Sequence, residues 1–310
     1  MSLPRHLGTG WRPDPLDERD FTPLHNLVRP MLAKTGLIRR LKKKRKLPRT
    51  VDLRRWCSPV QFQGGYNTCT AHVVADLIEF LEKKMSGKSV AASRLFLFKV
   101  TQSLAQVRGN TPVFLRQTMG TLAMVGVPPE RYWPYLKAGT LKKPRRKDPR
   151  LDAEPPALCY ALAGSYKGVK YFRLDPQASG SRIPTEKLLY AFKAHLAAGL
   201  PLSLGFPLYG SLAQAAKSGK VPFPAPQEKP LGSHAVLAVG YDDRLVIKNT
   251  IRGGPKTTGA LLFKNSWSTK WGMSGYGWLP YEFILQSLAR DFWTLMRADW
   301  IDTGQFQLPR

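Results

Sequence analysis

The sequence is poor in cysteine, and this scarcity limits the disulfide bonds and metal sites that could stabilise the fold. Its 310 residues include three cysteines, Cys57, Cys69 and Cys159. So few, and an odd number, argue against a disulfide framework, although Cys57 and Cys159 could pair and leave Cys69 free. The sequence has neither a CxxC pair nor a cluster of cysteine and histidine with metal-ligand spacing. We therefore expect neither a bound metal nor a cofactor.

Long apolar runs are also absent. No stretch of about 18 apolar residues suggests a transmembrane helix. The N-terminus, MSLPRHLGTGWRPDPLDERD, lacks the apolar core of a secretory signal. By default we expect a cytoplasmic protein, with export by a signal-independent route left open.

Acidic residues are scarce relative to basic ones. The chain has 48 Lys and Arg against 21 Asp and Glu, a formal net charge of +27. Residues 39–46 and residues 137–150 form two basic runs with seven basic residues each. They are either solvated surface or weak binding surfaces for a polyanion such as nucleic acid or an anionic membrane. Neither run is interleaved with aromatic residues that stack on bases, so charge alone does not define a nucleic-acid-binding module.

The first half of the chain has a helical pattern. Residues 1–50 form a polar, Pro-rich extension that ends in the first basic run. Helical periodicity follows over residues 70–84, 93–106 and 113–125. In the first of these patterns Glu79 and Lys84 fall outside the apolar stripe. The basic stretch 137–156 contains several prolines and is expected to be an exposed connection.

The second half has the pattern of a sheet. After one more helical pattern at 184–198, short apolar runs separated by Gly, Pro and Asp predict strands at 201–206, 234–241, 245–248 and 260–264. Helices followed by strands indicate an α+β protein. We expect a helical lobe at 51–160, a strand-rich, barrel-like lobe at 161–300 and a C-terminal tail at 301–310.

Cys69 has the position of a nucleophile. It follows two glycines and begins a predicted helix, where free N–H groups and the helix dipole stabilise a thiolate. His234, in GSHAVLAVGYDD at the start of an apolar strand, is the best candidate for its base. Asn265 ends the next strand and could accept a hydrogen bond from the imidazole. Gln63 could supply an amide to an oxyanion hole, together with the Cys69 backbone N–H.

Each of these signals is weak when taken alone. A lone cysteine before a helix is more often buried and inert, and a lone histidine at a strand start is usually structural. The other four histidines fit less well: His6 and His25 lie in the extension, and His72 and His195 lie within helical patterns. The ordered combination of Gln, Cys, His and Asn is much more specific.

This combination resembles the papain-like cysteine peptidases. Residues 63–72, QGGYNTCTAH, are similar to the family segment Q-G-x-C-G-S-C-W-A-F. Residues 232–236, GSHAV, resemble the base segment, and residues 265–276, NSWSTKWGMSGY, resemble N-S-W-G-x-x-W-G-x-x-G-Y. The resemblance spans about 51–284. It implies a two-lobed fold with the active site in the cleft between the lobes, and peptide or protein substrates.

The resemblance also implies roles for single residues. Cys69 would be the thiolate nucleophile, His234 the base and acid, Asn265 the residue that orients the ring, and Gln63 an oxyanion donor. Trp267 would belong to the substrate-binding region. Ala235 follows His234, and Gly205 is expected to face it. Because both are small, we expect a roomy apolar pocket for one substrate residue. That residue is the one just before the residue that contributes the carbonyl of the cleaved bond.

The extension carries a finer match. Residues 10–20, GWRPDPLDERD, resemble the N-terminal G-W-x-P-D-x-x-D-x-R-D segment of bacterial members, which favours a prokaryotic or phage origin. Family members are commonly held inactive by an N-terminal segment in the cleft. The alternative is a disordered tail, but residues 1–38 hold too many apolar side chains for a purely solvated one. We predict that part of 1–38 packs near or over the cleft and that 39–46 is an exposed, cleavable connector.

Several positions depart from the family pattern. Tyr66 replaces a half-cystine, Thr70 replaces a tryptophan after the nucleophile, His72 replaces an aromatic residue and Ser268 replaces a glycine. The substrate-binding N-G-G loop is missing. Two functions therefore stay open: a cysteine endopeptidase or related acyl-transfer hydrolase, and a catalytically weak relative that binds an anionic partner.

Overall fold

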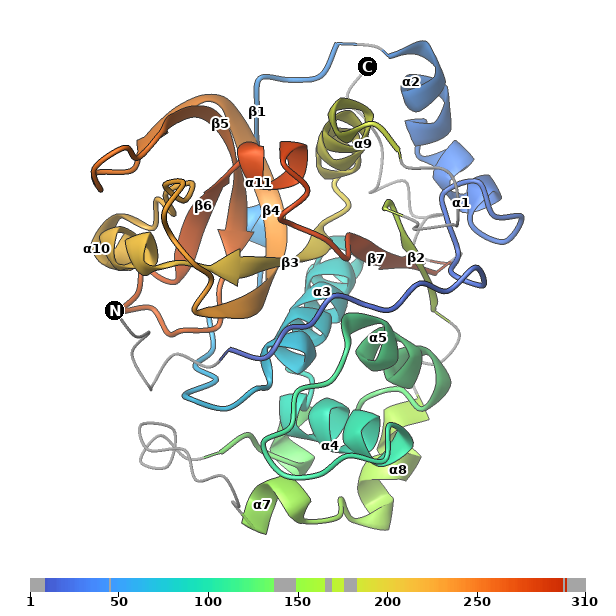
Figure 1. Cartoon of the computed structure of the whole chain (residues 1–310). Helices are drawn as coiled ribbons and strands as arrows, with labels where there is room; N and C mark the ends of the chain where they lie inside the picture. The colour runs from blue at the N-terminus through green and yellow to red at the C-terminus, as the bar shows by residue number, and fades with distance from the viewer. Residues whose placement is uncertain are drawn as a thin grey trace.

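The computed structural model describes residues 9–44, 46–136, 149–164, 169–175, 183–297 and 299. Figure 1 shows the strands β3–β6 on one side and the helices α4, α5, α7 and α8 on the other, with helix α3 between them. The fold is α+β, as predicted, with antiparallel sheets. The predicted tail 301–310 and most of the basic run 137–150 lie outside the described residues.

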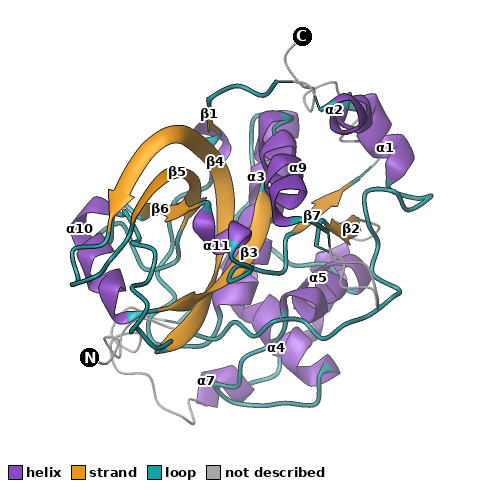
Figure 2. Cartoon of the chain, turned by 45° about the horizontal axis from the view of Figure 1, so that its top comes forward, coloured by secondary structure: helices purple, strands orange, loops and turns teal. Residues whose placement is uncertain are grey.

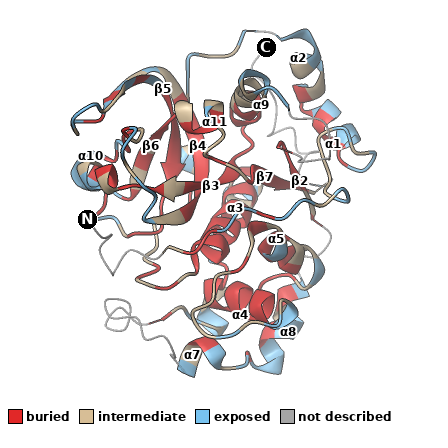
Figure 3. Ribbon diagram, viewed as in Figure 1, coloured by how far each residue is buried: buried red, intermediate tan, exposed pale blue. Residues whose placement is uncertain are grey.

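The three helices expected in the first half of the chain are present. They are α3 (Cys69–Ser86), α4 (Arg94–Leu104) and α5 (Leu115–Met124), each within two residues of its predicted bounds. α3 ends at Gly87, whose φ of 79° suits a residue without Cβ. The Ser93 side chain caps α4 by accepting a hydrogen bond from the Phe96 N–H. Figure 3 shows α3 buried along most of its length, because it packs against helices and sheet together.

The main sheet has the order β1-β4-β5-β6, with β3 also paired to β4. Its strands are β1 (Thr50–Asp52), β3 (Leu202–Leu208), β4 (Gly232–Lys248), β5 (Lys256–Lys264) and β6 (Tyr276–Pro280). The prediction of separate strands at 234–241 and 245–248 was wrong, because both belong to β4. Register shifts against β5 bend this strand without ending it, and Figure 2 shows its curvature. In the described ranges the strands follow an open path.

A second, two-stranded sheet lies beside the main one. β2 (Lys170–Arg173) pairs with β7 (Trp293–Met296), so Arg173 lies opposite Trp293. The backbone of Arg290, just before β7, exchanges two 2.9 Å hydrogen bonds with Gly205 of β3. This bridge brings the C-terminal part of the chain to the strand beside His234.

Further helices and turns lie in the described ranges. The helices are α1 (Arg29–Lys34), α2 (Leu37–Lys43), α7 (Pro149–Asp152), α8 (Ala157–Ala163), α9 (Thr185–Ala197), α10 (Ala215–Ser218) and α11 (Glu282–Leu285), with 3₁₀ turns η1 (Arg54–Trp56), η2 (Glu130–Tyr132) and η4 (Gly210–Gln214). The end of the predicted connection 137–156 is thus not wholly exposed, because α7 buries Leu151. In the extension Val28, Leu32 and Leu37 are buried. None of the helices in the described ranges is both long enough and apolar enough to span a membrane.

Candidate active site

Cys69 begins α3, and its side chain is fully buried. Backbone N–H groups of Ala235, Thr70, Cys69 and Gly10 lie near its sulfur and act to lower the pKa of the thiol. Burial nevertheless raises the pKa of the Cys69 thiol to about 11, against the opposing effect of these donors. In this closed arrangement the environment favours the neutral thiol.

His234 lies on β4 and is oriented by Asn265. Its Nε2 is 2.8 Å from Asn265 Oδ1. The Ser266 N–H donates to the same oxygen at 2.8 Å, which fixes the orientation of the Asn265 amide. Because that oxygen can only accept, Nε2 carries the proton, and Nδ1 has no hydrogen-bond partner among the described residues. Burial lowers the pKa of His234 to about 4, with the Asn265 hydrogen bond opposing it. The imidazole is therefore neutral and can act as a base through Nδ1.

Trp267 shields this imidazole from solvent. Its ring is stacked on that of His234, with a centroid separation of 4.3 Å, and it also contacts the edge of Trp271 at 5.4 Å. Trp267 is buried. The Trp267 ring thus covers one face of the His234 imidazole.

Gln63 is buried, and both the nitrogen and the oxygen of its side-chain amide are hydrogen-bonded. Its Nε2 donates to Tyr66 O at 2.8 Å, and its Oε1 accepts a short hydrogen bond from the Ser266 hydroxyl. The Gln63 backbone N–H also donates to Ser266 O at 2.9 Å. These contacts join the segment before Cys69 to the segment after Asn265. One amide hydrogen of Gln63 is used by Tyr66, and the second is the one an oxyanion would take.

A buried ion pair ties the nucleophile helix to the strand that carries Asn265. Lys264, at the end of β5, lies 2.9 Å from Asp76 of α3 and donates to the Ser58 hydroxyl at 2.9 Å. Arg94 contacts Asp76 at 2.7 Å and Glu79 at 3.0 Å. Sequence analysis missed this network and placed Glu79 outside the buried stripe. The contacts were not visible because their members lie far apart in the sequence, 206 positions for Ser58 and Lys264.

Three other histidines, all in the described ranges, have structural contacts. His72 Nδ1 lies 3.0 Å from Thr68 O, and His195 Nδ1 lies 2.7 Å from Ala191 O. His25 stacks on Phe21 at 3.8 Å. Cys57 and Cys159 are free, as is Cys69, so the pairing left open from the sequence does not form.

The extension contacts β3 and the start of β4. Figure 1 shows the dark-blue chain passing across α3, away from the main sheet and toward α1. The Gly10 N–H donates to Ser233 O at 3.1 Å, and the Ser233 hydroxyl donates a short hydrogen bond to Trp11 O. The Trp11 indole lies on Gly205, where an added Cβ would be 2.0 Å from the ring. Ala235 and Gly205, both expected to line a substrate pocket, face each other in the β3–β4 register.

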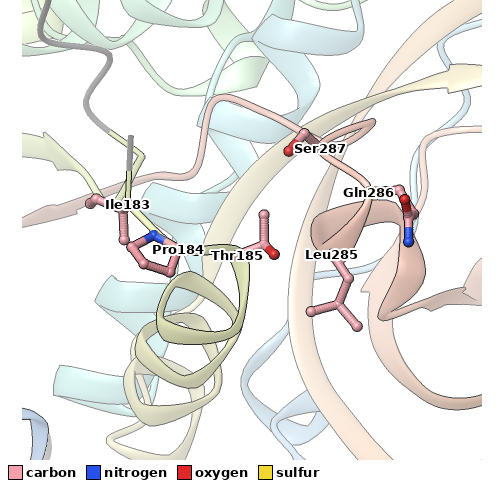
Figure 4. Close-up of a pocket in the computed structure, with 6 residues that line it drawn as sticks. All are labelled: Ile183, Pro184, Thr185, Leu285, Gln286 and Ser287. Atoms are coloured by element: carbon pink, nitrogen blue, oxygen red, sulfur yellow. The ribbon is translucent and has the colours of Figure 1, made fainter. Parts of the chain in front are cut away.

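An open cavity of about 380 Å³ lies elsewhere on the molecule. Figure 4 shows it between the start of α9 and the end of α11, lined by Ile183, Pro184, Thr185, Leu285, Gln286 and Ser287. None of the predicted site residues lines it. Cys69 and His234 are fully buried and do not line this cavity. The cavity is therefore separate from the candidate active site.

Comparison with known proteins defines the class. Residues 47–283 match the papain family of cysteine proteases. The chain belongs to this family and is a papain-like cysteine peptidase, a hydrolase.

Particular relatives agree with this assignment. The crystal structure of xylellain, a cysteine protease from Xylella fastidiosa, is 29% identical with a TM-score of 0.68, covering 96% of this chain and 99% of that one. An uncharacterised peptidase C1-like protein of Acanthamoeba polyphaga mimivirus is 29% identical over 76% of this chain and 69% of its own length. Digestive procathepsin L 3 of Tenebrio molitor larval midgut shares the fold, at 18% identity and a TM-score of 0.57, over 82% of this chain and 71% of that one.

Proposed function

We propose that Cys69, His234, Asn265 and Gln63 carry out papain-type peptide hydrolysis. The observation that supports this most strongly is the orientation of the His234 ring. Its Nε2 is bound to Asn265, and its Nδ1 has no partner among the described residues. The backbone N–H of the next residue, Ala235, lies near the Cys69 sulfur and acts to lower its pKa. Nucleophile, base and orienting group thus occur in one connected arrangement.

The reaction follows from these positions. His234 Nδ1 takes the Cys69 proton as the sulfur attacks the carbonyl carbon of the peptide. The Gln63 amide and the Cys69 backbone N–H stabilise the resulting oxyanion. The imidazolium then donates its proton to the leaving amine, and a thioester with Cys69 is formed. Water, deprotonated by His234, hydrolyses the thioester and regenerates the thiol.

We also propose that the extension inhibits the enzyme by covering the cleft. The residues that match the G-W-x-P-D-x-x-D-x-R-D segment make the docking contacts. Trp11 donates to Asp291 at 2.8 Å, and Trp293 donates to Asp14 at 2.7 Å. Asp20 accepts two hydrogen bonds from Arg116, at 2.7 and 2.6 Å. This supports a bacterial-type docking segment held by indole and guanidinium groups.

A third proposal concerns the basic run 39–46. Its side chains at 39, 42, 43, 44 and 46 are exposed. They suit weak, salt-sensitive association with a polyanion and also a cleavable connector behind the docking segment.

Labelling with a thiol-reactive epoxide, followed by cleavage of a peptide library, tests the peptidase. Cys69→Ala should abolish activity, and His234→Ala should lower activity nearly as far, because nucleophile and base act as one unit. Asn265→Ala should lower activity less, since Asn265 only orients the imidazole ring. Full hydrolysis by Cys69→Ala would refute the site. Removing residues 1–48 should accelerate both labelling and cleavage, whereas a folded but no faster protein would refute the inhibitory role.

A further inference from the structure

The hydroxyl of Tyr135 lies between the two chain segments that carry the proposed oxyanion donors. It donates to the Gln63 backbone carbonyl at 3.1 Å and lies 2.6 Å from the Thr68 hydroxyl. Gln63 carries the side-chain amide of the oxyanion hole. Thr68 directly precedes Cys69, which carries the backbone N–H. One oxygen atom of a residue 67 positions beyond Thr68 therefore contacts both segments.

The donors and acceptors at this oxygen are determined. A tyrosine hydroxyl has one hydrogen, and here the Gln63 carbonyl accepts it. The Thr68 hydroxyl is then the donor in the shorter contact. Burial raises the pKa of the Tyr135 hydroxyl, so the group remains a neutral donor. The two hydrogen bonds thus run in one direction, from Thr68 through Tyr135 to Gln63.

Thr68 does not use its hydroxyl in the way that a helix N-cap usually does. It is the N-cap of α3, but its side chain makes no capping hydrogen bond. Its backbone carbonyl still accepts from the His72 N–H at 3.1 Å, as at the start of a helix. Thr68 is fully buried. Its hydroxyl therefore binds the Tyr135 oxygen instead of capping the helix that begins with Cys69.

Tyr135 is itself held at its backbone and at its ring. Its N–H donates to one carboxylate oxygen of Glu130 at 2.7 Å, and the other oxygen of Glu130 accepts from the Arg94 N–H at 3.2 Å. The rings of His72 and Tyr135 meet edge to face, with a centroid separation of 4.8 Å. These contacts fix the position of the hydroxyl that the two donor segments share.

We propose that Tyr135 is a positioning residue that sets the separation of the two oxyanion donors. Such donors act when they lie about 2.7–3.1 Å from the oxyanion, and a misplacement of about 1 Å can lower a rate about 10²-fold. In this role Tyr135 does not contact the substrate, because it acts through Gln63 and through the peptide that joins Thr68 to Cys69. The inference rests on the proposed peptidase function and adds the residue that controls the geometry of its oxyanion hole.

The test compares two reactions of the same sulfur in the full chain with Trp11→Ala, which removes the indole that packs on Gly205. Peptide hydrolysis passes through an oxyanion. Alkylation by iodoacetamide does not, because the sulfur–carbon bond forms at a saturated carbon as iodide leaves and His234 takes the thiol proton. Both rates scale with the fraction of open molecules, so the ratio of hydrolysis to alkylation reports the oxyanion hole. If Trp11→Ala does not fold, the wild-type chain serves for the same ratio.

Tyr135→Phe removes the hydroxyl and keeps the ring. We expect kcat for a peptide substrate to fall about tenfold or more, with KM and the alkylation rate nearly unchanged. Tyr132→Phe is the matched control, because the Tyr132 hydroxyl contacts the exposed Arg131, and it should leave the ratio at the parent value. A folded Tyr135→Phe enzyme with an unchanged ratio, or with hydrolysis and alkylation lowered together, would overturn the proposal.

Substitution of Thr68 tests the same contact from the other segment. Thr68→Val keeps the shape of threonine without the hydroxyl and should lower kcat without slowing alkylation, whereas Thr68→Ser should lower kcat less. Adding Thr68→Val to Tyr135→Phe should lower kcat little further, because both changes break one contact. Losses that multiply would overturn the bridge. If Tyr135→Phe does not fold, the comparison of Thr68→Val with Thr68→Ser decides the question, and equal ratios for the two would overturn the proposal.

Failure of this inference can be told from failure of the proposed function. A parent protein whose Cys69 is alkylated but that cleaves no peptide would refute the peptidase function, and this inference with it. A parent that cleaves peptides, with the same ratio of hydrolysis to alkylation in the Tyr135 and Thr68 variants, would refute the inference alone.

Discussion

Substitution of Trp11 by alanine should uncover Cys69. A buried tryptophan removes roughly 150–250 Å² from water, and truncating one costs about 3–5 kcal/mol. Trp11 also loses its hydrogen bond to Asp291. Since each 1.4 kcal/mol is about a factor of ten, the population with the extension undocked should rise by a factor between about 10² and about 4 × 10³. Cys69 is fully buried in the docked state, so its labelling rate should rise by the same factor until the open form predominates.

The assay is the rate of Cys69 alkylation by a small neutral thiol reagent, followed by mass spectrometry. Leu32→Ala is the matched control, because Leu32 is a fully buried residue of the extension on α1. It should lower the melting temperature without a comparable gain in Cys69 labelling. A folded Trp11→Ala protein labelled no faster than wild type, or no faster than Leu32→Ala, would refute the reasoning.

Three further outcomes are expected. Gln63→Ala should lower kcat about 10²-fold if its amide stabilises the oxyanion; unchanged kcat would remove it from the site. Burial raises the pKa of Asp14 to about 6 and that of Asp291 to about 8, so both stabilise the docked form most at low pH and lose this effect as pH rises through those values. The melting temperature should fall over that range, and less so in Asp14→Asn; an identical fall would contradict the assignment. Replacing the exposed basic residues of 39–46 by Gln should weaken low-salt binding to DNA or anionic vesicles, whereas unchanged binding would show that the run is only solvated surface.

The sequence was informative where chemistry is local. Cys69 could be placed at a helix start because glycines precede it and an apolar period of 3.6 residues follows it. Asn265 and His234 were recognisable as ends of neighbouring apolar runs, and the structure joins them by a 2.8 Å hydrogen bond. Gln63 was expected to donate an amide, and its amide is held in place by Tyr66 and Ser266.

Contacts between distant segments could not be predicted in this way. Apolar residues in the extension suggested that it packs on the body, but nothing in the sequence pairs Asp14 with Trp293, 279 positions away. Asp291 was not singled out, because a lone Asp before a short strand has no distinctive pattern. Glu79 was placed off the buried face because periodicity assigns charge to solvent, whereas Arg94 neutralises it inside the fold.

The Lys264–Asp76 pair joins helix α3 to the end of β5 by charge, and all three cysteines are free thiols. A reductant strong enough to keep Cys69 reactive therefore breaks no crosslink that the architecture depends on. Oxidation of Cys69, once the extension is undocked, would in contrast silence the proposed nucleophile without cutting a covalent link of the scaffold. For this chain, loss of activity in an oxidising medium and loss of structure should be separate events, with the first reversed by thiols.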